Sequence, residues 1–197
     1  MKELIIATKN SGKMKDFKSL FEPLGIKVSS LLDVAEPIED IEETGTTFEE
    51  NAAIKAEAIC AKFNVPVIAD DSGIEIDALN GAPGVYSARY AGEDKDDQAN
   101  YEKVLAEMSN VADAERTGRF VCVLALARPN KQTIFERGEC EGMIAREPVG
   151  EHGFGYDPIF YPEASEKSMA QLTPVEKNRI SHRRKALDKI ERWVKEL

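Results

Sequence analysis

Apolar residues recur in two patterns along this chain, and together these patterns predict a mixed α/β fold. Short apolar or alternating runs are typical of strands, and they occur at residues 4–8, 27–30, 67–69, 75–79, 119–127 and 132–141, with 139–144 extending or bending the last run. Apolar residues at helical spacing predict helices at residues 13–21, 47–63, 96–108 and from about 181 onwards. Since some strands are distant in sequence and others form hairpins, we expect a mixed sheet flanked by helices.

Signals at helix ends support these boundaries. Thr46 and Thr47 each precede a glutamate by three residues, which is the pattern of a capping box. Thr173 has the same relation to a glutamate, and Pro174 follows it at the first helical position. The acidic segment 33–45 carries no such signal, and we expect it to be a loop that crosses an open cleft.

The size of the chain fits one domain spanning residues 1–197, because 197 residues of which 42% are hydrophobic can build a sizeable core. No run of about 18 apolar residues occurs, so we expect no membrane partner. The first residues turn polar too early for a signal peptide. Cys60 and Cys122 lie in apolar runs and no CxxC pair exists, which favours buried reduced thiols and a cytoplasmic location.

The net charge of −10 disfavours a nucleic-acid partner, since a duplex-binding protein needs a basic surface. It does not exclude a phosphorylated small molecule, for which local cations suffice. Lysine and arginine residues gather in two places that could supply them, Lys9, Lys13 and Lys15, and then Lys177, Arg179, Arg183 and Arg184.

The most informative stretch is the strand at residues 67–69 followed by Asp70, Asp71, Ser72 and Gly73. Two adjacent carboxylates at the mouth of a buried strand repel each other and resist desolvation. A metal ion or a cationic substrate site would neutralise them. The alternative is an ordinary turn, because aspartate, serine and glycine are all turn residues.

A second candidate is the turn from Thr8 to Lys13, which joins the first strand to the first helix. Such a turn gathers main-chain N–H groups and the positive end of a helix, which suits a phosphate. It is not a Walker A loop, because Ala7 and Met14 stand where that motif needs glycine and serine or threonine. A plain strand-to-helix turn with a solvated lysine remains an equal alternative.

Glu42 and Glu43, in the acidic loop, are candidates for a carboxylate that meets Asp71 and holds Mg²⁺ with it. Magnesium prefers oxygen ligands, takes few of them from protein, and completes its octahedron with water and phosphate. The competing interpretation is a solvated run of charge, which is the usual role of such a segment.

The segment from Gly150 to Pro158 contains three glycines within six residues and two aromatic side chains. Phe154, between Gly153 and Gly155, could offer an open ring face to a nucleobase. An aromatic that anchors a loop to the core is the alternative, and it fits Tyr156 and Phe160 better than Phe154. The basic stretch 177–184 follows, in which Ser181 is a candidate helix cap.

Taken in order, these pieces resemble the Ham1-like inosine/xanthosine triphosphate pyrophosphatase family over nearly the whole chain. The segments that carry the resemblance lie at residues 8–13, 46–52, 69–73, 81–90, 153–158 and 181–183. The resemblance implies an α/β fold with a long curved mixed sheet, two lobes around a central cleft, and a homodimer. It also implies Mg²⁺-dependent hydrolysis of the non-standard purine nucleoside triphosphates ITP, dITP and XTP to the monophosphate and pyrophosphate.

The resemblance further implies a role for individual residues. Asp71 would be the proton acceptor and a metal ligand, with Glu42, or Glu43 if the loop register differs by one, as the second metal ligand. The phosphates would be held by Thr8, Lys9, Asn10, Ser11, Gly12, Lys13 and Lys177. The rest of the nucleotide would be contacted by Ser72, Phe154, Gly155, Tyr156, Asp157, His182 and Arg183.

These roles suggest a mechanism in which water attacks the α-phosphorus, Asp71 takes its proton and lysines stabilise the charge on the phosphates. Strand alternation places Asp70 and Asp71 on opposite faces, but both faces are apolar, so alternation does not choose between them. Donors from Arg183 or His182 would favour a 6-oxo purine over adenine. Two alternatives remain open: a pyrophosphatase for other damaged nucleotides, such as the Maf-type proteins, and a nucleotide sensor without activity.

Overall fold

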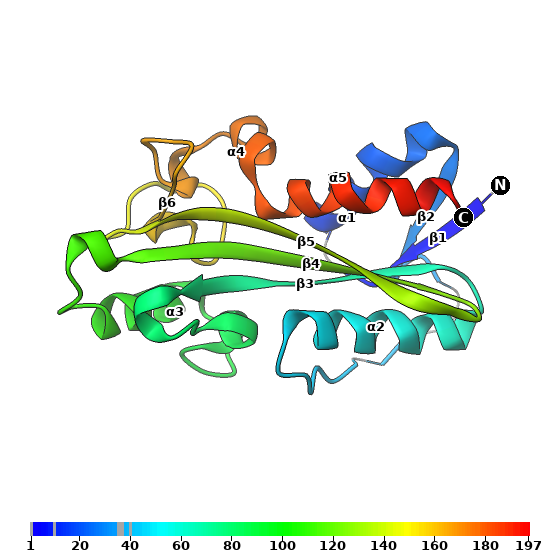
Figure 1. The fold of residues 1–197 in the computed structure, drawn as a ribbon, viewed down its shortest axis with the longest axis horizontal. Coiled ribbons are helices and arrows are strands. Elements are labelled where there is room, and N and C mark those ends of the chain that lie inside the picture. The colour runs from blue at the N-terminus through cyan, green and yellow to red at the C-terminus, as the bar shows by residue number, and fades with distance from the viewer. Residues whose placement is uncertain (1, 10, 35–37, 40) are drawn as a thin grey trace. The chain divides into compact units, whose positions relative to one another are not determined.

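The computed structural model describes residues 2–9, 11–34, 38, 39 and 41–197 (Figure 1). Its sheet has the strand order β2-β1-β3-β4-β5-β6. The strands are β1 (Lys2–Ile6), β2 (Ile26–Ser30), β3 (Val67–Ile76), β4 (Thr117–Arg128), β5 (Lys131–Ile144) and β6 (Phe160–Pro162). β1 pairs in parallel with β2 and β3, whereas β5 and β6 are antiparallel, so the predicted mixed sheet is confirmed.

The α-helices are α1 (Ser11–Phe21), α2 (Phe48–Phe63), α3 (Asp97–Glu107), α4 (Pro174–Ile180) and α5 (His182–Lys195). Both predicted capping boxes are present: Thr47 caps α2 with Glu50, and Thr173 caps α4 with Glu176. The Ser181 hydroxyl accepts the N–H of Arg184 at 3.1 Å, as expected for the cap of the last helix. Among the described residues, no helix is both long and apolar enough to cross a membrane.

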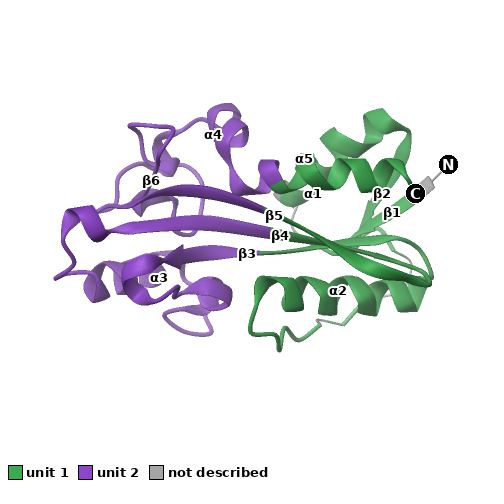
Figure 2. Ribbon diagram, in the orientation of Figure 1, with its two compact units in different colours: residues 1–71, 123–137, 186–197 green, residues 72–122, 138–185 purple. Residues whose placement is uncertain are grey.

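The chain forms two compact units (Figure 2). Unit 1 comprises the described parts of residues 1–71, 123–137 and 186–197, and unit 2 comprises residues 72–122 and 138–185. In unit 1, α2 lies on one side of the strands and α1 and α5 lie on the other (Figure 1). This covering explains why β3 and β4 read as continuous apolar runs in the part of the sequence that belongs to unit 1.

The core of unit 2 contains one buried arginine. Arg116 is 3% exposed and donates to the main-chain oxygens of Met108, Ile144 and Ala145 at 2.6–2.9 Å. Burial lowers its pKa. The surrounding cluster includes Ile74 from β3, so a charged side chain here connects the end of α3 to the sheet.

The structure excludes the alternative interpretation of residues 70–73 as a turn, and it extends the predicted strand at residues 67–69. β3 is a single strand of ten residues that runs through Asp70, Asp71, Ser72 and Gly73. The turn interpretation is therefore wrong, and the two carboxylates lie within a strand rather than at its mouth. The alternating segment at residues 75–79 is not a separate strand either, because β3 ends at Ile76 and a 3₁₀ turn follows over Asp77–Leu79.

The predicted hairpin between residues 119–127 and 132–141 is present, with Asn130 at φ 57° in the turn between β4 and β5. Asparagine tolerates this left-handed conformation better than most residues. Cys60, Cys122 and Cys140 are all buried and form no disulfide, which agrees with the expected reduced thiols.

Candidate active site

Asp70 and Asp71 are both buried in β3, and each has a different set of neighbours in unit 1. Asp70 is 2% exposed, and its carboxylate receives the ammonium of Lys13, from α1, at 2.6 Å. A lysine therefore neutralises Asp70, and the predicted strand-to-helix turn supplies that lysine. Asp71 lies at the next position along the strand, and its neighbours come from α2 and the acidic loop.

Lys55 is a cation whose charge acts on this second carboxylate. Its ammonium, carried by α2, donates to the main-chain oxygen of Asp70 at 2.6 Å and to the Glu43 carboxylate at 2.8 Å. Burial opposes the charge of Lys55, but the negative charges of Asp70, Glu43 and Asp71 outweigh this effect and raise its pKa. Lys55 therefore stays protonated near neutral pH.

The surroundings of Asp71 alter its protonation strongly. Burial, followed by the charges of Glu43 and Asp70, raises its pKa from 3.8 to about 6, although Lys55 and a hydrogen bond from Asn51 act in the opposite direction. A pKa near 6 leaves Asp71 ionised at neutral pH but ready to accept a proton. This is the property required of a general base.

Asn51 links Asp71 to the acidic loop. It is 1% exposed, and its Oδ1 accepts the N–H of Gly45 at 2.8 Å, while its side chain also bonds to Asp71. Asn51 and Lys55 are four residues apart, so one face of α2 presents both to the site. Sequence reasoning assigned neither a role. The available signal was that two polar residues share a helix face with buried Ala52, Ala56 and Ile59.

The acidic loop brings Glu43, rather than Glu42, close to Asp71. Glu43 pairs with Lys55 and contributes to the raised pKa of Asp71, whereas Glu42 is exposed. Asp40, another acidic residue of this loop, lies outside the described residues. Within the described part of the chain, no group of three or more acidic, histidine or cysteine side chains is arranged to hold a metal.

The predicted phosphate-binding turn follows β1. Thr8 is buried, Lys9 is exposed, and α1 begins at Ser11, while Asn10 lies outside the described residues. The main-chain oxygen of Thr8 accepts the N–H of Leu31 at 3.3 Å. The expected strand and helix N-terminus are therefore present, and Gly12 belongs to the first turn of α1.

Unit 2 contains a pocket of about 140 Å³. All eight residues of unit 2 that were predicted to contact substrate line it, namely Ser72, Phe154, Gly155, Tyr156, Asp157, Lys177, His182 and Arg183. The lining is completed by residues that sequence reasoning did not assign, namely Gly73, Ser87, Ala88, Asp97 and Phe120. Segments far apart in the sequence thus form one cavity.

Aromatic and cationic side chains set the character of this pocket. Phe154 is 64% exposed, and the Lys177 ammonium lies 4.8 Å from the centre of its ring. Lys177 also forms an ion pair with the buried carboxylate of Asp157. The His182 ring stacks on Phe120, with 5.0 Å between ring centres and 17° between planes. These groups can hold a flat, polar, negatively charged ligand.

Tyr156 and Phe154 differ as expected. Tyr156 is 4% exposed, its hydroxyl donates to the main-chain oxygen of Ser87 at 2.7 Å, and burial raises its pKa above the usual range. Tyr156 is thus an anchor of the loop, and Phe154 is the aromatic ring that remains open.

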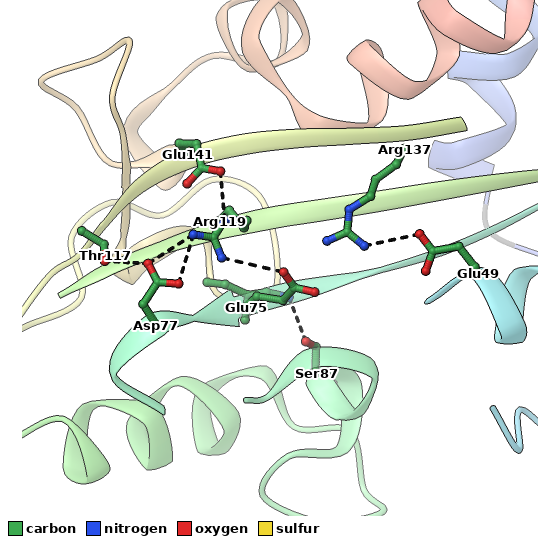
Figure 3. Close-up of polar contacts among 9 residues, drawn as sticks. Glu49, Glu75, Asp77, Ser87, Thr117, Arg119, Arg137 and Glu141 are labelled. Carbon is green, nitrogen blue, oxygen red and sulfur yellow. Dashed lines mark hydrogen bonds and ion pairs between the residues drawn. The ribbon is translucent and has the colours of Figure 1, made fainter. Parts of the chain in front are cut away.

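A second polar group lies on the strands of unit 2 outside this pocket (Figure 3). Arg119 on β4 donates to Glu141 at 2.9 Å and to Asp77 at 3.0 Å, and it lies 3.8 Å from Glu75. Its guanidinium thus meets one carboxylate from β3, one from β5 and one from the turn after β3. This group cross-links the strands.

A buried carboxylate with a raised pKa beside a lysine, and a pocket with an exposed aromatic ring, are the chemical features of this α/β protein. The model of one family, described as the Ham1 family, matches residues 4–193. The chain belongs to the Ham1 family.

Individual relatives agree with this assignment. The chain is 60% identical to a dITP/XTP pyrophosphatase from Oceanobacillus iheyensis, over 98% of each protein. It is 57% identical to a dITP/XTP pyrophosphatase from Bacillus subtilis, again over 98% of each. Among solved structures, the Staphylococcus aureus Ham1 protein has a TM-score of 0.92 at 47% identity, covering 99% of both chains. A HAM1 protein from Coxiella burnetii has a TM-score of 0.93 at 43% identity over 100% of both.

Proposed function

We propose that this chain is a nucleoside triphosphate pyrophosphohydrolase that converts ITP, dITP and XTP to the monophosphate and pyrophosphate. Relatives that share more than half of its residues are named for dITP and XTP. The observation that carries the proposal is the state of Asp71, a buried carboxylate whose pKa is raised to about 6. A structural ion pair would lower the pKa of such a group, whereas a general base needs it raised.

The reacting phosphate is assigned to the group in unit 1. The oxygen of water attacks the α-phosphorus, its proton passes to Asp71, and the bond to the β-phosphate breaks so that pyrophosphate leaves. Lys13, the N-terminus of α1 and the turn from Thr8 would stabilise the charge that develops on the phosphate oxygens. Lys177 remains the predicted phosphate contact from unit 2.

The residues in unit 1 fit a magnesium ion, and the proposal includes one. Asp71 and Glu43 supply hard oxygen ligands, and the raised pKa of Asp71 indicates that its negative charge is incompletely compensated. Of the two predicted ligands, Glu43 is preferred over Glu42, because the charge of Glu43 acts on Asp71 whereas Glu42 is exposed. When bound, Mg²⁺ would neutralise phosphate charge and make water more acidic.

The purine is assigned to the pocket in unit 2. Phe154 would stack on the base, and His182 or Arg183 would donate to the oxygen at its position 6. Adenine carries an amine there, so a donor would face a donor and go unpaired, at a cost of about 1–3 kcal/mol. This difference supports selection of inosine and xanthosine nucleotides over ATP.

Three further features belong to the proposal. The enzyme would act as a homodimer, in the cytoplasm, and would remove damaged purine nucleotides from the nucleotide pool. The cytoplasmic location is supported by three buried cysteines that form no disulfide.

A substrate panel with pyrophosphate detection tests the proposal. With Mg²⁺, the wild type should release pyrophosphate from ITP, dITP and XTP much faster than from ATP, and Asp71→Asn should lose most of its turnover. Preference for another modified nucleotide would favour a Maf-like function. Mg²⁺-dependent binding of ITP without any product would favour a sensor and contradict the proposal.

A further inference from the structure

The loop that carries Phe154 is held by two carboxylates from different parts of unit 2. The N–H of Phe154 donates to Asp157 Oδ2 at 3.0 Å, and the N–H of Gly155 donates to Asp97 Oδ2 at 2.7 Å. Gly153 and Gly155 adopt φ values of 81° and 61°, which few other residues tolerate. A loop of this composition needs external contacts to hold one conformation.

Asp97 is the contact that comes from furthest away in the sequence. It lies in the first turn of α3, directly after Asp96, which caps that helix by accepting the N–H of Ala99 at 3.0 Å. Asp96 satisfies the helix terminus, and Asp97 reaches a loop that lies 58 residues further along the chain. α3 is itself a firm support, because Val104 is fully buried in the core of unit 2.

Asp157 does not duplicate this role. Its carboxylate is shared between the N–H of Phe154 and the ammonium of Lys177, so it acts within the loop and toward α4. Tyr156 fixes the far side of the loop through its bond to Ser87. Asp97 alone, among the contacts described for Gly155, ties that residue to an element outside the loop.

We propose that Asp97 is a positioning residue for the purine: it holds the backbone at Gly155 so that the ring of Phe154 stands open to the base. This inference rests on the proposed function. A hydrogen bond from an N–H to a carboxylate is stronger than one between neutral groups. A loop that is ordered before binding loses less entropy when the base stacks on it. In this role Asp97 acts through Gly155.

The test compares Asp97→Ala, Asp97→Asn and the neighbouring control Asp96→Ala. Steady-state kinetics with ITP separate KM from kcat, and inhibition by tripolyphosphate reports binding of the phosphate chain without a base. Asp97→Ala should raise KM for ITP about tenfold, with kcat within about twofold and unchanged tripolyphosphate inhibition. Asp97→Asn keeps an acceptor oxygen and should recover most of the loss. Asp96→Ala removes the helix cap and should lower stability without raising KM.

An unchanged KM in folded Asp97→Ala would overturn the inference, as would an equal rise in KM for Asp96→Ala or a parallel loss of tripolyphosphate inhibition. If Asp97→Ala does not fold, Asp97→Glu provides the same comparison, because one additional methylene moves the carboxylate away from Gly155. Failure of the wild type to hydrolyse any purine triphosphate would refute the proposed function and this inference together. If the wild type hydrolyses ITP and the Asp97 variants have the same KM for ITP as the wild type, only the positioning role is refuted.

Discussion

Replacing Asp71 by asparagine is expected to stabilise the protein while it removes activity. Asp71 is 8% exposed, and burial together with the charges of Glu43 and Asp70 raises its pKa from 3.8 to about 6. A carboxyl group of this kind favours the folded state when protonated, and its contribution is lost as the pH rises through the folded pKa. Each tenfold difference in proton affinity corresponds to about 1.4 kcal/mol. Ionised Asp71 therefore lowers the free energy of unfolding by about 3 kcal/mol near pH 8.

Urea unfolding of the wild type and Asp71→Asn, with EDTA present to remove divalent cations, measures this difference. The variant should be more stable by about 3 kcal/mol at pH 8 and by roughly half as much at pH 5, where the wild-type carboxyl is largely protonated when folded. Asparagine preserves the size of the side chain and can accept the bond from Asn51. Glu93→Gln, which changes an exposed carboxylate, is the matched control and should stay within about 0.5 kcal/mol at both pH values.

Equal or lower stability of Asp71→Asn at pH 8 would refute this reasoning. A gain of the same size at both pH values would refute it as well, because the effect would then not come from ionisation. Either result would remove the main physical argument that the site needs a cation.

Three further predictions concern other parts of the molecule. Arg116→Met should lower the free energy of unfolding in urea by about 3 kcal/mol or more, because three buried carbonyl groups lose their donor; a loss below about 1 kcal/mol would contradict this. With ITP, kcat should fall about tenfold per pH unit below the pKa of Asp71, which is about 6 without metal and lower with a bound cation; residual activity of Asp71→Asn with the same acid limb as the wild type would exclude Asp71 as the base. Gly153→Ala should raise KM for ITP at least about tenfold, since a Cβ would lie 1.9 Å from Asp157 Oδ2. Gly25→Ala, which has a similar positive φ but no atom within 4 Å of a Cβ, should leave KM unchanged.

Sequence patterns predicted the parts of the fold that local physics controls. The capping boxes at Thr47 and Thr173 were found because each needs only residues three apart. β3 was misread because Asp70, Asp71, Ser72 and Gly73 have turn propensity, which tertiary pairing in the sheet overrides. β6 was missed because a strand of three residues has no recognisable alternation.

The candidate site was predictable where sequence neighbours form it. The open ring of Phe154 followed from its flanking glycines, and the anchoring of Tyr156 from its place between the loop and the core. Lys55 and Asp97 were missed because a polar residue on a helix usually faces solvent. Only the tertiary fold shows that one reaches a buried carboxylate and the other a distant glycine.

The most direct test of the account is hydrolysis of ITP in oxygen-18-enriched water with mass analysis of both products. Attack at the α-phosphorus with Asp71 as base predicts one labelled oxygen in IMP and none in pyrophosphate, and little product of either kind from Asp71→Asn. Label in pyrophosphate or in free phosphate, or full turnover by Asp71→Asn, would contradict it.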